Sequence, residues 1–140
     1  MITRSIIKIL KNDTTICTLL GAVDADSCPV FTTFNFDNTV DKQVNVSLEY
    51  GETRPFDQDA KTHDGRMRVY VLVKDTVSEP INVMHQIASR VLALLDLKGT
   101  TLDTSNLIYW VQKLDTDFTH YVDLHFYELT ITFRFVNKEV

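Results

Sequence analysis

The sequence predicts an α+β domain: a mixed, mostly antiparallel sheet of four to five strands, with one main amphipathic helix on one face and a short N-terminal helix pair. Two observations carry this prediction. Apolar and polar residues alternate along several β-branched and aromatic runs, which is the period of a half-buried strand. One stretch after the middle of the chain instead repeats its apolar residues at helical spacing.

Length and charge limit the classes of protein that fit. The chain has 140 residues, and 14 basic against 19 acidic residues give a net charge of −5. That length suits one domain, residues 1–140. No cluster of Lys and Arg provides the basic stripe that sequence-specific DNA binding normally needs. No run approaches the ~18–20 uncharged apolar residues of a membrane-spanning helix. We therefore expect a single domain with no membrane partner and no specific contact to DNA.

The N-terminal segment predicts two short helices. Ile6, Ile9 and Leu10 lie on one face of a helix that starts near Thr3. Asp13 is a good N-cap for a second helix, which runs through Leu20. Gly21 is suited to end that helix in a left-handed conformation.

Three strands are expected before the main helix. The first is the β-branched and aromatic run 30–36. The second, 44–50, alternates apolar residues with Asn45, Ser47 and Glu49, and this predicts one wet face. In the third, 67–73, both faces carry apolar residues, so we expect a central strand.

The main helix is predicted from Ser78, as N-cap, to Asp96, with Pro80 in the first turn. Its apolar face consists of Ile81, Met84, Ile87, Ala88, Val91, Leu94 and Leu95.

Two further strands are expected after it. Leu107 to Leu114 is one, and a long strand closes the chain. In that last strand Val122, Leu124 and Phe126 hold one phase, and residues 129–135 hold the other. The slip at Phe126-Tyr127 predicts a β-bulge or a bend.

The segment Gly51–Gly65 is predicted to be a long loop, because it is charged, has glycine at both ends and contains a single large apolar residue, Phe56. It is either a solvated tip or an arm that becomes ordered on a partner. On the second interpretation, the candidate assembly interface consists of Arg54, Phe56, Asp57, Asp59, Lys61, Arg66 and Arg68.

Signatures of catalysis are weak. The sequence has no phosphate-binding glycine loop, no G-x-S-x-G and no H-E-x-x-H. Asp123 and His125 alternate along a predicted strand and, with His120, define the alternative of a small hydrolase or metal-binding protein. A plain polar strand face explains the same residues.

Other polar and thiol residues add little to that alternative. The acid pairs Asp57/Asp59 and Asp115/Asp117 lie in predicted loops. Cys17 and Cys28 are too far apart for a C-x-x-C motif and are expected to be buried or incidental thiols, with a disulfide between them as the less favoured alternative. We predict no catalytic, cofactor-binding or metal-binding residues.

The order of elements resembles a known family. A helix pair ends in LLG (19–21), strands lead into RMRVYVLVKD (66–75), one helix INVMHQIASRVLALLD (81–96) follows, and the chain closes on HFYELTITFRFV (125–136). From Ile6 to Val136 this is similar to the tail-terminator, or tail-completion, proteins of long-tailed bacteriophages.

The resemblance implies a structural role in the virion. Such subunits form a ring, of six copies by resemblance, at the head-proximal end of the tail after assembly in the host cytoplasm. The ring stops polymerisation of the tail-tube protein and joins the tail to the head connector, while DNA passes through without specific binding. It implies no cofactor and no enzymatic activity. The alternative within the same class is a neck or head–tail adaptor subunit.

Overall fold

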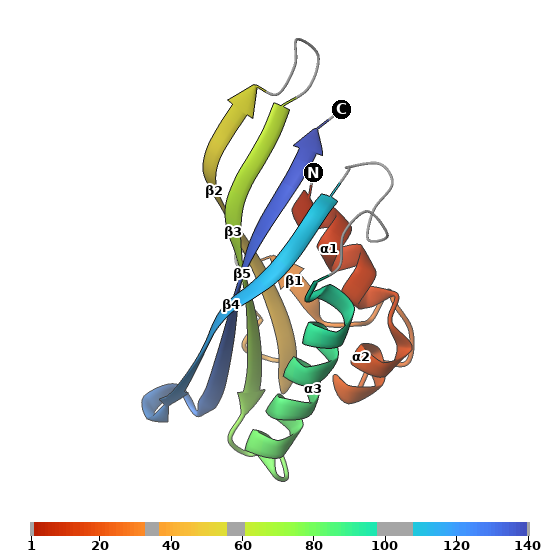
Figure 1. The fold of residues 1–140 in the computed structure, drawn as a ribbon. Helices are drawn as coiled ribbons and strands as arrows, with labels where there is room; N and C mark the ends of the chain where they lie inside the picture. Colours follow the sequence, from red (N-terminus) through yellow and green to blue (C-terminus); the bar gives the residue numbers. More distant parts are fainter. Residues whose placement is uncertain (1, 33–36, 56–60, 98–107, 140) are drawn as a thin grey trace.

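The computed structural model describes residues 2–32, 37–55, 61–97 and 108–139 (Figure 1). Within these ranges the helices are α1 (Ile2–Lys11), α2 (Thr14–Leu19) and α3 (Pro80–Leu95), with a single 3₁₀ turn, η2 (Val122–Leu124). The strands are β1 (Val30–Thr32), β2 (Lys42–Pro55), β3 (Lys61–Lys74), β4 (Ile108–Tyr121) and β5 (Phe126–Glu139).

The described strands form one sheet in the order β1-β2-β3-β5-β4. β1 runs parallel to β2, and all other neighbours are antiparallel. This confirms the predicted α+β class with a mixed, mostly antiparallel sheet. It also confirms that the strand around 67–73 is central, because β3 has β2 on one side and β5 on the other.

The helices lie on one face of the sheet, and the core fills the space between them (Figure 1). Val69 of β3 lies opposite Ile131 of β5, and both side chains are fully buried. They pack in the same cluster as Ile87 and Val91 of α3 and Ile6 of α1. No described helix covers the opposite face, so a strand can bury one set of alternate residues against the helices and turn the other set toward this opposite side. We call this opposite side the outer face.

Local signals place the N-terminal helices as expected. Asp13 caps α2, and its carboxylate accepts a hydrogen bond from the Ile16 backbone N–H at 2.9 Å. Gly21 follows the helix with φ +79°, in the left-handed region that glycine adopts at little cost. Ile6 and Leu10 are fully buried, and Ile9 packs at the edge of the core.

The main helix differs from its prediction at both the cap and the buried face. Glu79, not Ser78, is the N-cap residue, in a left-handed conformation (φ 50°) and without a side-chain cap hydrogen bond. Pro80 holds the first helical position, as expected from its missing N–H. Ile81, in the first turn, is exposed, and Leu94 is only partly buried.

The predicted loop at 51–65 is wrong for most of its length. β2 continues to Pro55 and β3 begins at Lys61, so residues 51–55 and 61–65 pair as strands. The pairing includes Arg54 with Thr62 and Pro55 with Lys61, after an irregularity between Tyr50 and Glu52. Residues 56–60 lie outside the described residues.

The end of the chain is a hairpin and not one long strand. Residues 122–124 form η2, and His125 has φ 60°, so the change of phase before Tyr127 is a turn between β4 and β5 instead of a bulge. Asp123 and His125 therefore do not share a strand face. β4 begins one residue after the predicted start at Leu107, which lies outside the described residues, and continues past Leu114 to Tyr121. Asp115 and Asp117 consequently lie in a strand and not in a loop.

Two smaller expectations change as well. The predicted strand 30–36 is described only as Val30–Thr32, and its remaining residues lie outside the described ranges. Asn45, expected on a wet face, is buried together with Gln43. The Asn45 amide donates to Gln43 Oε1 at 3.1 Å, and Gln43 also exchanges hydrogen bonds with the Asp37 backbone. These bonds satisfy the Gln43 amide and the Asn45 nitrogen on the outer face, whereas Asn45 Oδ1 is buried without a hydrogen-bond partner.

Both cysteines are buried and free, which confirms the expectation of buried thiols. The Cys17 thiol donates a hydrogen bond to the Lys11 carbonyl at 3.0 Å. Burial, with a smaller contribution from the neighbouring Cys17 thiol, raises the pKa of Cys28 to about 12. Cys28 is therefore protonated and unreactive at neutral pH.

Candidate assembly surface

The outer face of the sheet carries two of the predicted interface residues, Arg66 and Arg68. They lie at alternate positions of β3, the central strand, and Arg66 is exposed. Arg134 of β5 is directly opposite Arg66. Glu49 occupies the register position beside Arg66 on β2. We call Arg66 and Arg68 the arginine row.

Acidic residues stand on the other side of the same surface. Asp115 and Asp117 of β4 lie opposite Thr132 and Thr130 of β5. A hollow of about 660 Å³ separates these acids from the arginine row. Its lining residues are Arg66, Arg68, Tyr70, Leu114, Asp115, Asp117, Phe118, Thr119, Glu128, Thr130 and Thr132. We call Asp115 and Asp117 the acidic edge. The surface is thus polar and divided by charge, unlike the mostly apolar pockets that hold small molecules.

The lower part of β4 extends beyond the helical layer. Every residue from Gln112 to Tyr121 is exposed, although a strand within a covered sheet would bury every second side chain. Figure 1 shows this end of the β4–β5 hairpin turning away from α3. Phe118 is 48% exposed, and Val122 and Leu124 of the turn are each 65% exposed. An arm with exposed apolar side chains on both faces is typical of a segment that contacts a partner.

A small network of aromatic and charged groups stiffens this arm. Tyr127 stacks on His120 with ring centroids 4.1 Å apart and on Phe118 at 5.8 Å. Asp75, just after β3, lies between two histidines: its Oδ2 is 3.7 Å from His120 Nε2 and 3.5 Å from His125 Nδ1.

This network bears on the metal-binding alternative. The structure brings His120 and His125 to Asp75, a relationship that depends on the hairpin turn and carries no local sequence signal. Within the described ranges, no group of three or more His, Cys, Asp or Glu side chains is arranged to hold a metal ion.

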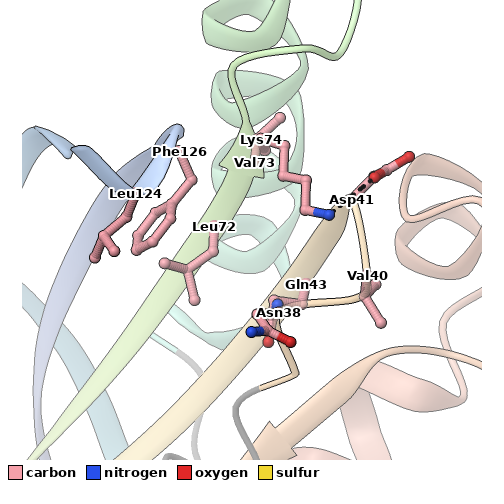
Figure 2. Close-up of a pocket in the computed structure, with 9 residues that line it drawn as sticks. All are labelled: Asn38, Val40, Asp41, Gln43, Leu72, Val73, Lys74, Leu124 and Phe126. Atoms are coloured by element: carbon pink, nitrogen blue, oxygen red, sulfur yellow. Dashed lines mark ion pairs between the residues drawn. The ribbon is translucent and has the colours of Figure 1, made fainter. Parts of the chain in front are cut away.

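A second hollow lies beside the turn, with a volume of about 240 Å³ (Figure 2). Leu72, Leu124 and Phe126 form an apolar wall on one side. An ion pair between Lys74 and Asp41, 3.5 Å long, borders the other side. The volume is below the ~300–1,000 Å³ typical of sites for drug-sized ligands.

The other predicted interface residues are less informative. Arg54 and Lys61 lie in the paired ends of β2 and β3, at the far end of the sheet from η2. Phe56, Asp57 and Asp59 lie outside the described residues. The structure therefore groups Arg66 and Arg68 with Asp115 and Asp117, which sequence reasoning assigned to a loop. To find this relationship from the sequence, the predicted strand at 107–114 would have had to extend to Tyr121, and its register with β5 would have had to be known.

Comparison with known proteins gives a structural relationship without a sequence family. No protein-family profile matches the sequence, and no curated protein matches it significantly. Among solved structures, the fold is similar to a chain of the "Virion of native gene transfer agent (GTA) particle", with a TM-score of 0.72 and 11% sequence identity. The match covers 95% of this chain and 91% of that chain. At this identity the similarity establishes a shared fold. None of the described helices is both long and apolar enough to span a bilayer.

Proposed function

We propose that this chain is a structural subunit of a phage or phage-like virion, and that it acts as a tail terminator. The observation that carries the proposal is the fold shared with a virion chain over nearly the full length of both. The resemblance of the sequence to tail terminators, drawn from different evidence, points in the same direction. In this role, copies of the chain form a ring, of six by resemblance, that caps the tail tube and meets the head connector.

The surfaces support a role in assembly. A subunit of a closed ring needs two different surfaces, because each contact is head-to-tail and must close after a fixed number of copies. The outer face offers an arginine row and an acidic edge, and the exposed hairpin arm adds apolar contacts. None of these surfaces requires catalytic chemistry.

The net charge suits a channel for DNA. The chain carries −5 overall, and DNA carries a dense negative charge of its own. A ring with a net negative charge would not hold the passing DNA by electrostatic attraction, so DNA would slide through instead of binding.

Two measurements test the proposal. Native mass spectrometry and electron micrographs of the purified chain should show rings. In a phage that carries this gene, a nonsense mutation should produce tubes of uncontrolled length that fail to join heads. Tails of normal length that remain separate from heads would favour the neck-adaptor alternative, and normal virions would contradict both roles.

A further inference from the structure

We propose that the acidic edge of one copy docks onto the arginine row of the next copy. The proposal rests on the function proposed above, because it assigns the head-to-tail contact of the ring. It joins two surfaces of the same chain that are complementary in charge. Because the two surfaces lie on different strands of one sheet, each copy can contact one neighbour through its acidic edge and the other neighbour through its arginine row.

Only part of the edge strand β4 is accessible to another copy. The upper part of this edge strand is closed by the end of α3: the Asp96 carboxylate accepts from the Lys113 backbone N–H at 2.8 Å, and the Leu97 N–H donates to the Val111 carbonyl at 2.8 Å. Beyond Lys113, no described element covers the edge. An uncovered edge strand is a template for contact with another chain.

The accessible part of β4 carries both acidic and apolar side chains. Asp115 and Asp117 lie in it, with Leu114 and Phe118, which are 45% and 48% exposed. This combination gives a partner both charge and apolar area. It also explains the acids themselves, since charged side chains on an exposed edge prevent pairing with unsuitable strands. The same acids would bind a partner that presents arginines, so they would exclude unsuitable strands and select this partner.

The surface that receives the acidic edge is the arginine row of β3. On β3 the arginine row is two strands from β4, so roughly 10 Å of sheet separates the two backbones. The hydroxyl groups of Thr130 and Thr132 line the space between, and Tyr70 lies beside it. Arginine forms two-pronged hydrogen bonds with carboxylates, which suits a specific contact. Arg68 also engages a group of its own, so the test must separate contacts within a copy from contacts between copies.

Paired charge reversals distinguish contacts within one copy from contacts between copies. One variant carries Arg66→Glu and Arg68→Glu, and a second carries Asp115→Lys and Asp117→Lys. Each should fail to form rings, with self-association weakened at least about tenfold, because like charges then face each other. An equimolar mixture should restore rings of alternating copies, since every contact again joins opposite charges. Asp26→Lys and Lys8→Glu, which reverse charges on the exposed loop after α2 and on α1, are matched controls and should leave ring formation unchanged.

The outcomes distinguish this inference from the proposed function. Particle mass from light scattering and unfolding temperature are measured for every variant. Rings of normal mass in either double variant would overturn the docking contact and leave the terminator role standing. Lower unfolding temperatures with no rescue on mixing would also overturn it, because the charges would then act within one copy. A wild-type chain that stays monomeric at all concentrations would contradict both this contact and the ring proposed above, and the tail phenotype would then show whether the chain still acts in tail assembly.

Discussion

Asp13, at the start of α2, is joined to Arg90 of α3 by a salt bridge. Arg90 Nη2 donates to Asp13 Oδ1 at 2.7 Å, and Nε donates to Oδ2 at 3.0 Å, so the contact is two-pronged. The same carboxylate caps α2 through the Ile16 N–H. One side chain therefore fixes the start of α2 and ties it to the middle of α3.

Replacing Asp13 should separate the cap from the ion pair. Asp13→Ala removes both and should lower the free energy of unfolding by about 1–2 kcal/mol, at the upper end of the range for a lost N-cap. Asp13→Asn keeps a capping oxygen and should cost less, since the partly exposed Arg90 side chain can turn to solvent. Urea denaturation measures both. Equal losses for Ala and Asn would show that the cap contributes nothing.

The ion pair predicts a dependence of stability on pH. The hydrogen bond from Arg90 is the largest of the effects that lower the pKa of Asp13 below its ordinary value of 3.8. A carboxyl with a lowered folded-state pKa stabilises the fold above its unfolded pKa, and the contribution disappears as pH falls through the folded pKa. The wild type should thus lose its advantage over Asp13→Asn only below about pH 4–5. An advantage that is constant from pH 7 to pH 2.5 would contradict this origin.

The core prediction compares two leucine-sized residues on α3. Ile87 is fully buried, and Ile87→Ala should cost roughly 2–5 kcal/mol because it leaves a cavity. Leu94 is only partly buried, so Leu94→Ala should cost clearly less. Met84→Leu nearly preserves volume and should cost under about 1.5 kcal/mol. Denaturant midpoints measure all three, and equal losses at Ile87 and Leu94 would contradict the burial described above.

Local signals in the sequence were enough to predict most of the fold. The cap at Asp13, the turn at Gly21 and the helical stripe of α3 depend on neighbouring residues, and each was found. The hairpin ends 51–55 and 61–65 were missed because they are charged and lack apolar alternation, so pairing with neighbouring strands holds them as strands against weak local preference. Residues 122–124 were missed for the opposite reason: Val122 and Leu124 are apolar residues in an exposed turn.

The candidate surface was only half predictable. Arg66 and Arg68 belonged to the predicted interface together with the charged residues of the segment 51–65, which they follow directly in the sequence. Asp115 and Asp117 reach the same surface only through the register of β4 with β5. Register depends on contacts between distant segments, which one sequence does not reveal. The same limit explains why Asp75 was not associated with His120.

Gly21 supplies a test of backbone conformation. A Cβ at this position would have its nearest contact at 3.9 Å, with Lys42 Nζ, so space is not the obstacle. The obstacle is the left-handed φ of +79°, and Gly21→Ala should therefore lower the free energy of unfolding by roughly 1–2 kcal/mol. Thermal unfolding measures the change, with Thr18→Ala on the exposed side of α2 as the control. A stability equal to wild type would mean that residue 21 is not held in the left-handed region.

The last prediction concerns the end of the β2–β3 hairpin. Deleting residues 51–64 and joining Tyr50 to Gly65 by an Asn-Gly turn retains every residue of β2 and β3 whose side chain is described as buried, including Met67. The domain should stay folded, with a modest loss from the pairs that 61–64 make with the end of β5. The arginine row and the acidic edge remain, so rings should still form. If Arg54, Phe56 and their neighbours contact the tail tube or the connector, these rings should fail to join tails to heads. Complementation of a phage that lacks the gene measures that joining, and full complementation by the shortened chain would exclude this hairpin end from the assembly interface.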